Sequence, residues 1–242
     1  MENTQLIASN LIPFIEKANE ILFVLNAVKE NSLGSISKLG VQKVLYLSSA
    51  LAPLKGVIMK IYEFLSEKRG PYSKHIQNYL DHFIAAGLVE LVGYKELREG
   101  YSVAQYQITE SGTRAVMLLK AYSKEREKES WINLITRLSI YFAGEKDLAD
   151  SNFRGFDRIV ELVYSDPSFR KVRDASGSGR TLINQTDPVG PTAKLIEELK
   201  LKIEENPIFN WINESPYKLE ILTWAILEFY LDKYLGGEMP VL

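Results

Sequence analysis

The chain has 242 residues and a hydrophobic fraction of 46%, which is enough apolar material for a full core in one large or two ordinary domains. Cysteine is absent, which excludes disulfides, thiol catalysis and zinc sites built on cysteine. The net charge of −2 is uneven, since residues 36–122 hold eleven Lys or Arg against seven Asp or Glu while both flanks are acidic. This mildly basic middle permits nucleic-acid binding but is less basic than a dedicated DNA-binding domain.

An amphipathic helix is predicted over residues 10–29, within an amino-terminal part that spans residues 1–35. Its apolar residues recur at spacings of three and four, and they are Leu11, Phe14, Ile15, Ala18, Ile21, Leu22, Leu25 and Val28. This stripe packs either on the protein's own core or on a second chain, and the former is commoner among amphipathic helices. Glu16 and Lys17 interrupt the apolar run, and no stretch approaches the roughly 20 residues of a membrane span, so we expect a cytoplasmic protein without membrane contact.

Two further helices are predicted after a break at residues 31–35. The first runs from about Lys38 to Leu51. The second begins at Pro53 and reaches Lys68. Its apolar stripe is Val57, Ile58, Ile61, Tyr62 and Leu65.

The stretch from Arg69 to Gly112 predicts, in order, a turn, a helix, a hairpin and the start of another helix. Gly70 and Pro71 end the preceding helix, because glycine accepts positive φ and proline disfavours a helical residue before it. Ser73 and Thr109 are placed to cap the helices that follow them. The expected elements are a helix over residues 74–86, strands over 88–92 and 101–108, and a polar loop over 93–100.

These residues resemble the winged-helix domains of bacterial regulators, through Arg69-Gly70-Pro71-Tyr72-Ser73, Ala86-Gly87-Leu88-Val89-Glu90 and Tyr106-Gln107-Ile108-Thr109-Glu110-Ser111-Gly112. With Val41–Leu47 and Leu162–Phe169 added, the chain also resembles middle components of ABC-three-component and Lamassu-like antiphage defence systems. The resemblance implies an accessory subunit that bridges an ABC- or SMC-like ATPase and an effector subunit, and that also contacts double-stranded DNA.

The fold expected is therefore mainly α-helical, with a central winged helix-turn-helix at residues 36–122 whose wing is a small β-hairpin. The amino-terminal helix flanks it on one side and a helical domain over residues 123–242 on the other. Within that domain residues 166–191 are rich in Gly, Pro and Ser, which predicts a long loop. A helix from Ser215 and Pro216 to Leu235 is apolar on nearly all sides, so it is central in its domain or shared with another subunit.

The outer face of the helix over residues 74–86 and the hairpin tip form the candidate partner- or nucleic-acid-binding site. The residues expected to bind are Lys74, Gln77, Asn78, Asp81, His82, Lys95 and Arg98. Gln77 and Asn78 suit base edges and Lys74 suits phosphate, whereas Asp81 is repelled by phosphate. The hairpin tip also mixes acids with bases. Such mixed charge suits a protein surface better than DNA.

A second, weaker candidate surface is the basic side of the 166–191 loop. Its cations are Arg170, Lys171, Arg173 and Arg180. They would contact nucleic acid or an acidic partner, although a solvated loop is the commoner structure for such a segment.

No catalytic residue, metal site or cofactor is predicted. His75 and His82 lie seven residues apart, about 10 Å along one helix, which is too far for one metal ion. Gly179-Arg180-Thr181 lacks the lysine of a phosphate-binding loop. Asp187 with Glu198-Leu199-Lys200 has the residue order of a nuclease, but residues 198 and 200 diverge on a helix.

Two functional hypotheses follow from the sequence. The first is a non-enzymatic adaptor that binds other proteins through the helix at 74–86 and the wing. The second is a homodimeric transcriptional regulator that uses the same helix to read duplex DNA.

Overall fold

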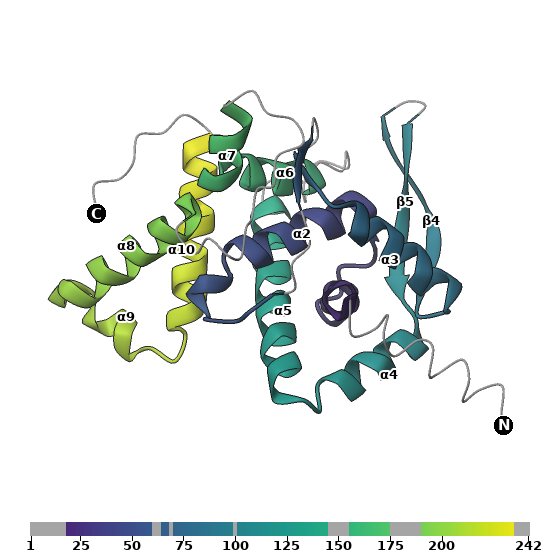
Figure 1. Ribbon diagram of the computed structural model, residues 1–242, viewed down its shortest axis with the longest axis horizontal. Coiled ribbons are helices and arrows are strands. Elements are labelled where there is room, and N and C mark those ends of the chain that lie inside the picture. Colours follow the sequence, from purple (N-terminus) through teal and green to yellow (C-terminus); the bar gives the residue numbers. More distant parts are fainter. Residues whose placement is uncertain are drawn as a thin grey trace.

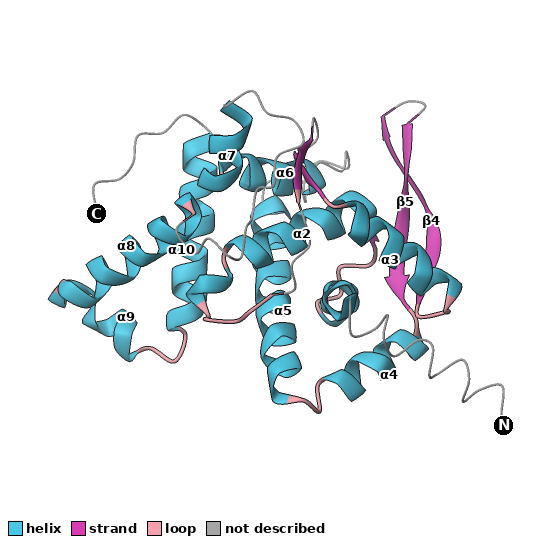
Figure 2. Cartoon of the chain, viewed as in Figure 1, coloured by secondary structure: helices cyan, strands magenta, loops and turns pink. Residues whose placement is uncertain are grey.

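The computed structural model describes residues 18–59, 64–67, 70–98, 101–144, 155–174 and 190–234. These residues are mainly helical, with a three-stranded antiparallel sheet and a separate two-stranded pair (Figures 1 and 2). The mainly α-helical class expected from the sequence is confirmed. Among the helices of the described ranges, none combines the length and the apolar character that a membrane span requires.

The first helix, over residues 18–30, lies inside the protein. Every residue from 18 to 28 is buried, including the polar side chains of Asn19, Glu20 and Asn26. Lys128 of a later helix lies 3.8 Å from the Glu20 carboxylate and partly offsets its burial. This helix therefore packs on its own chain. The part of the expected helix that precedes residue 18 lies outside the described residues.

Helix α2 (Lys38–Ala50) forms as expected, and the Ser37 hydroxyl caps it by accepting from the Gly40 amide at 3.1 Å. The helix expected from Pro53 to Lys68 is wrong. A short 3₁₀ helix, η1 (Ala52–Leu54), is followed by non-helical residues 55–59, and strand β2 (Leu65–Glu67) comes later. Ile61 and Tyr62 of the predicted stripe lie outside the described residues. Ile58, which the predicted stripe would have buried, is 80% exposed.

Strand β2 pairs with β3 (Gly70–Tyr72) in an antiparallel hairpin, so the predicted turn at residues 69–72 is largely strand. Gly70 has a φ of +87°, which glycine adopts at little cost. Along the chain, the hairpin comes between α2 and the next helix, where the sequence predicted the end of a second helix and a tight turn.

Helix α3 (Lys74–Ala85) and the strands that follow it form where they were expected. Strand β4 (Val89–Arg98) is longer than expected, because residues 93–98 of the predicted loop pair with β5 (Tyr101–Ile108). The sheet has the order β1-β5-β4, in which β1 (Ile36–Ser37) pairs with β5 and β4 is an edge strand. The predicted cap at Thr109 is confirmed, since its hydroxyl accepts from the Gly112 amide at 3.1 Å.

After α4 (Glu110–Leu119), the chain turns at residues 120–122 into the long helix α5 (Ser123–Gly144). Helix α5 packs against α2, α6 (Gly155–Ser165) and α10 (Lys218–Tyr234). The charged run at 124–129 is thus the first part of a packed helix. One of its carboxylates, Glu129, is buried and lies 3.0 Å from the Lys120 amine.

The long loop predicted at 166–191 is wrong for its first part, which forms helix α7 (Pro167–Asp174). The Asp166 carboxylate starts this helix by accepting from the Phe169 amide at 3.0 Å, a cap that the loop-like composition concealed. Residues 175–189 lie outside the described ranges. The chain then forms α8 (Pro191–Glu205), a 3₁₀ turn η2 (Pro207–Phe209) and α9 (Asn210–Glu214), and these elements lie beside α10 at the left of Figure 1.

One core joins the parts that the sequence analysis separated at residue 122. Buried side chains from the 18–30 helix, α2, α5, α6 and α10 belong to a single cluster. The Trp131 indole of α5 donates a hydrogen bond of 2.8 Å to the Ser48 carbonyl of α2. The division into domains remains a prediction, but the two sides of the proposed boundary share their packing.

A buried carboxylate, Asp166, fastens four helices together. The Tyr46 hydroxyl of α2 donates to it at 2.6 Å, and the Tyr230 hydroxyl of α10 donates at 2.9 Å. The Thr192 hydroxyl of α8 donates at 2.6 Å, and the Phe169 amide of α7 completes the set. Burial, and then the charge of Asp166, raises the pKa of both tyrosines well above the ordinary value. We call this cluster the Asp166 hub.

Substitutions in the Asp166 hub are expected to destabilise the protein in a definite order. Asp166→Ala leaves several buried donors without an acceptor and should cost about 3–5 kcal/mol of unfolding free energy, whereas Tyr46→Phe removes one bond to a charged acceptor and should cost about 1.5–3 kcal/mol. Tyr217→Phe alters an exposed hydroxyl and serves as the control. Urea denaturation measures all three, and equal stability of the Asp166→Ala variant and the parent would contradict the role of the hub.

Candidate functional site: helix α3 and the β4–β5 hairpin

The start of α3 is held by a buried glutamine of α2. The Gln42 amide donates to the Ser73 carbonyl at 2.9 Å and accepts from the Ser73 amide at 2.8 Å, so one side chain satisfies both backbone groups. Ser73 occupies the predicted N-cap position, but its hydroxyl makes no cap bond. Gln42, rather than Ser73, therefore fixes the entry of the chain into α3.

Lys43, the next residue of α2, holds the hairpin that precedes α3. Its ammonium group is buried and donates to the Pro71 carbonyl at 2.8 Å. A Cβ atom on Gly70 would lie 2.8 Å from the Lys43 nitrogen and 3.0 Å from the Tyr164 ring, so only glycine fits there. Burial lowers the pKa of Lys43 to about 7. An amine with a lowered pKa is a potential nucleophile, but this one is enclosed by the core and is not accessible to a substrate.

The outer face of α3 is exposed where the sequence analysis predicted it. Lys74, Asn78, Asp81 and His82 lie at the surface. Gln77 is half-buried, and its amide donates a hydrogen bond of 2.7 Å to the Asp81 carboxylate. The Gln77 amide, which suits a base edge, is therefore hydrogen-bonded to Asp81, whose carboxylate would be repelled by phosphate.

Strand β4 adds apolar side chains beside this helix face. Leu91 and Val92 are each 44% exposed, and Tyr94 is 71% exposed. Helix α3 lies against β4, and burial, then the charges of Asp81 and Tyr94, raises the pKa of Tyr106. We call the exposed residues Lys74, Asn78, Asp81, His82, Leu91 and Tyr94 the α3–β4 surface.

A β-bulge gives this surface its apolar side chains. Leu91 pairs with Tyr106, and Tyr94 pairs with Ala104, while Val92 has no partner on β5. Tyr106 and Ala104 are two residues apart and share one face of the sheet, so Leu91 and Tyr94 share it too. In a regular strand, residues three apart would point to opposite faces, and the extra residue Val92 brings them together.

The remaining predicted residues of the hairpin are placed by their backbone. Lys95 pairs with Val103, and Arg98 pairs with Tyr101, near the tip of the hairpin. Their side chains lie outside the described part of the structure. The hairpin rises beyond the helices at the right of Figure 1, so this part of β4 and β5 projects from the body of the protein.

The second predicted surface is helical. Arg170, Lys171 and Arg173 lie exposed on α7, while Arg180 lies outside the described residues. Arg173 lies 3.4 Å from the Asp174 carboxylate, and its guanidinium lies 6.0 Å from the centre of the Tyr164 ring. Lys171 and Arg173 also occupy the last turn, where cations stabilise a helix. Each of these contacts gives the basic residues a structural role.

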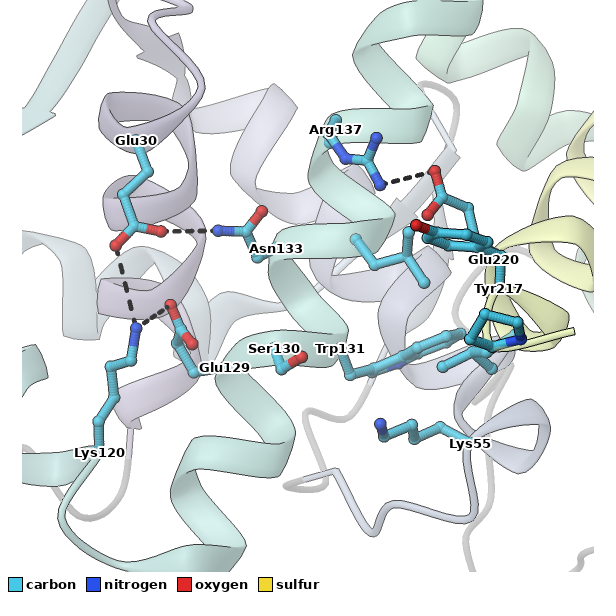
Figure 3. A pocket seen from close by; sticks show the side chains of 13 residues that line it. Glu30, Lys55, Lys120, Glu129, Ser130, Trp131, Asn133, Arg137, Tyr217 and Glu220 are labelled. Carbon is cyan, nitrogen blue, oxygen red and sulfur yellow. Dashed lines mark hydrogen bonds and ion pairs between the residues drawn. The ribbon is translucent and has the colours of Figure 1, made fainter.

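A cavity of about 380 Å³ lies between the end of the 18–30 helix, α5 and the start of α10 (Figure 3). Its charges pair with each other. Arg137 donates to Glu220 at 2.8 Å, Lys120 lies 3.0 Å from Glu129, and Asn133 donates to Glu30 at 2.7 Å. Lys55 is the cavity cation without a carboxylate partner among the described residues. These contacts join the 18–30 helix, α5 and α10.

A cluster of metal-binding side chains is also missing from the described ranges. They contain no group of three or more His, Asp or Glu side chains that would hold a metal ion. Glu198 and Lys200 lie on α8, as expected, and the Lys200 amine donates to the Pro53 carbonyl at 2.8 Å. Asp187 and residues 179–181 lie outside the described residues.

Sequence analysis missed the residues that position this surface. Gln42, Lys43 and Tyr46 were noted only as part of a resemblance, although polar residues among the apolar residues in the middle of a helix were a usable signal of buried hydrogen bonds. The exposure of Leu91 and Tyr94 was also missed, because their common face depends on the bulge. Comparison with protein-family models and with curated proteins finds no match for the chain.

Removing the two hydrogen bonds between Gln42 and Ser73 is expected to destabilise the start of α3. Gln42→Ala leaves the buried amide and carbonyl of Ser73 without partners and should lower the free energy of unfolding by about 1–3 kcal/mol. Gln107→Ala is the matched control, because Gln107 also donates to a backbone carbonyl, that of Gly34, but at the surface. Urea denaturation measures stability. Hydrogen exchange of the α3 amides should quicken only in the Gln42 variant, and unchanged α3 protection would contradict the assignment.

Lys43 is expected to make stability rise with pH. The folded state releases the Lys43 proton near pH 7, whereas the unfolded state keeps it to about pH 10.5, so the unfolded state binds more protons between these values. The free energy of unfolding should therefore rise between pH 7 and about 9.5, by at most about 1.4 kcal/mol per pH unit. Lys43→Met should reduce this slope, and Lys74→Met, at an exposed site, should not. Parallel curves for all three proteins would contradict the burial of a titrating amine.

Proposed function

We propose that this protein is a non-enzymatic adaptor that binds a protein partner through the α3–β4 surface. The observation that carries the proposal is the pair Leu91 and Tyr94, exposed beside a helix face that bears a carboxylate. Aromatic residues are enriched at protein interfaces, and clustered cations are the usual mark of nucleic-acid binding. In keeping with the sequence resemblance, the partners proposed are an ABC- or SMC-like ATPase and an effector subunit of a bacterial antiphage defence complex.

The order of elements supports a winged helix as the central unit. The helix over residues 18–30, β1, α2, α3 and the β4–β5 hairpin follow one another in the order typical of that fold, and β1 pairs with β5. In this assignment the 18–30 helix is the first helix of the unit, and the β2–β3 hairpin is inserted between its second and third helices. Helix α3 is then equivalent to a recognition helix.

The positions of the residues that carry the resemblance also support the proposal. Gln42 and Lys43 bind the Gly70–Ser73 segment, and Tyr46 binds Asp166. Three of the five runs that carry the resemblance therefore meet in the core, namely residues 41–47, 70–73 and 162–169.

The alternative is a homodimeric transcriptional regulator that inserts α3 into the major groove. Exposed Lys74 and Asn78 favour it, since they suit phosphate and adenine. The Gln77–Asp81 hydrogen bond and the apolar side chains of β4 favour the adaptor. They place a carboxylate and an apolar surface where the phosphates of bound DNA would lie.

The two hypotheses are separated by paired double variants tested on the complex recovered from the native operon. Leu91→Ser with Tyr94→Ser should weaken partner retention at least about tenfold, because anchor residues of an interface commonly contribute 2 kcal/mol or more. Gln77→Ala with Asn78→Ala should weaken retention far less, because it removes neither of the two apolar anchors. Met117→Ser, at an exposed apolar residue of α4, is the control.

The opposite pattern would overturn the proposal. A free dimer that shifts its own promoter duplex in a salt-sensitive manner, and that loses sequence discrimination in the Gln77 and Asn78 variant, is a groove-reading regulator. Undiminished retention in the Leu91 and Tyr94 variant would likewise remove the α3–β4 surface as the docking site.

A further inference from the structure

A second exposed apolar and acidic feature lies at the opposite end of the molecule. The segment over residues 204–214 contains Glu204, Glu205 and Glu214 and no Lys or Arg. All three glutamates are exposed, and within the described residues none of them forms an ion pair. Figure 1 places α8 and α9 at one end of the longest axis and the β4–β5 hairpin toward the other. We call this segment the 204–214 corner.

Two large apolar side chains stand out from the corner. Ile208 is 74% exposed, and Trp211 is 60% exposed. They are three residues apart in consecutive helical turns, so they project from the same side. Glu214 follows three residues later on that side. The corner therefore presents an apolar pair with carboxylates at both ends.

Ile208 and Trp211 lie in a segment whose backbone is held by hydrogen bonds. The Asn206 side chain caps η2 by accepting from the Ile208 amide at 3.1 Å. The Asn213 side chain donates to the Ile203 carbonyl at 3.2 Å, and Ile212 is buried against the core. These contacts fix the backbone on both sides of Trp211, so the indole is held outward by a rigid support.

The other two tryptophans of the chain pack against neighbouring side chains. Trp131 is fully buried and donates to the Ser48 carbonyl. The Trp224 ring packs between Tyr141 and Phe142, at centroid distances of 4.8 Å and 4.7 Å. Trp211 has no such ring neighbour in the described residues. A rigidly presented, exposed tryptophan is typical of an interface anchor.

We propose that the 204–214 corner is a second protein-docking site, which binds a partner whose apolar pocket is rimmed by Lys or Arg. Trp211 and Ile208 enter the pocket, and Glu204, Glu205 and Glu214 meet its basic rim, since complementary charge speeds encounter and excludes acidic partners. The inference rests on the proposed adaptor function, because a bridge between two proteins requires two separated surfaces. It assigns the second of them.

Site-specific photo-crosslinking in the cells that make the protein tests this assignment. A benzoylphenylalanine at Asn210, which is exposed next to Trp211, reports on the corner, and one at Asn78, which is exposed on α3, reports on the α3–β4 surface. Both anchors of each surface stay intact in the full-length chain. Mass spectrometry of the Asn210 crosslink should identify a peptide of a different protein with Lys or Arg beside apolar residues.

Variants of the corner should then remove that crosslink. Trp211→Ser with Ile208→Ser, and separately the triple reversal Glu204→Lys, Glu205→Lys and Glu214→Lys, should each lower its yield at least about tenfold. Glu197→Lys with Glu198→Lys reverses exposed charges elsewhere on α8 and should preserve it. A thermal melt like that of the parent shows that each variant is folded, and the reversal variant tests the charge argument independently of the apolar pair.

The outcomes distinguish the two assignments. A crosslink from Asn210 to a second copy of this chain, to nucleic acid or to an acidic peptide would overturn the inference, as would the absence of a crosslink or its survival in the triple reversal. A crosslink from Asn78 under the same conditions would leave the adaptor function standing on the α3–β4 surface alone. A crosslink from Asn210 without one from Asn78 would support the corner and remove the α3–β4 surface.

Discussion

Three polar side chains on a single buried helix organise the rest of this molecule. Gln42, Lys43 and Tyr46 project from α2, and each satisfies a partner that is distant in sequence: Ser73, Pro71 and Asp166. Buried polar groups without partners are costly, so the burial of α2 depends on both segments that these side chains bind. This requirement couples the entry of α3 to the packing of the carboxy-terminal helices. The same α2 residues thus orient the candidate surface and close the core.

The elements that the sequence predicted correctly are those with a local signal. Helices α2 and α3 have apolar spacings of three and four, and the Thr109 cap lies three residues before its donor, so periodicity and short-range capping identify them. The helix expected over residues 53–68 was a wrong prediction, because the residues of its apparent apolar stripe do not pack together on one helix face. Leu65 pairs across a hairpin, and Ile58 faces solvent. The end of the expected helix instead forms a hairpin with β3, and Lys43 holds that hairpin by donating to the Pro71 carbonyl, 28 residues away in the sequence.

The candidate surface was predictable in its charges but not in its shape. The mixed acids and bases of α3 follow directly from residue order, as does their outward direction once the opposite stripe is buried. The apolar contribution of β4 was hidden, because Leu91 and Tyr94 are three apart and would diverge in a regular strand. Their shared face results from the unpaired residue Val92, and a bulge of this kind has no clear signature in a single sequence. Similarly, α7 was masked by a loop-like composition, since its start depends on a side chain that also belongs to the Asp166 hub.

The hydrogen bonds of the Asp166 hub affect how an adaptor with this structure would act. The Asp166 carboxylate accepts from four donors contributed by α2, α7, α8 and α10. Helix α2 also positions α3, while α8 leads into the 204–214 corner, so the hub lies on the path between the two proposed surfaces. Transmission of a signal along such a path requires an element with two alternative arrangements. A fully satisfied buried carboxylate favours one arrangement, because any shift would leave at least one donor unpaired in the core. The structure is therefore better suited to holding two partners at a fixed separation than to relaying a conformational change between them.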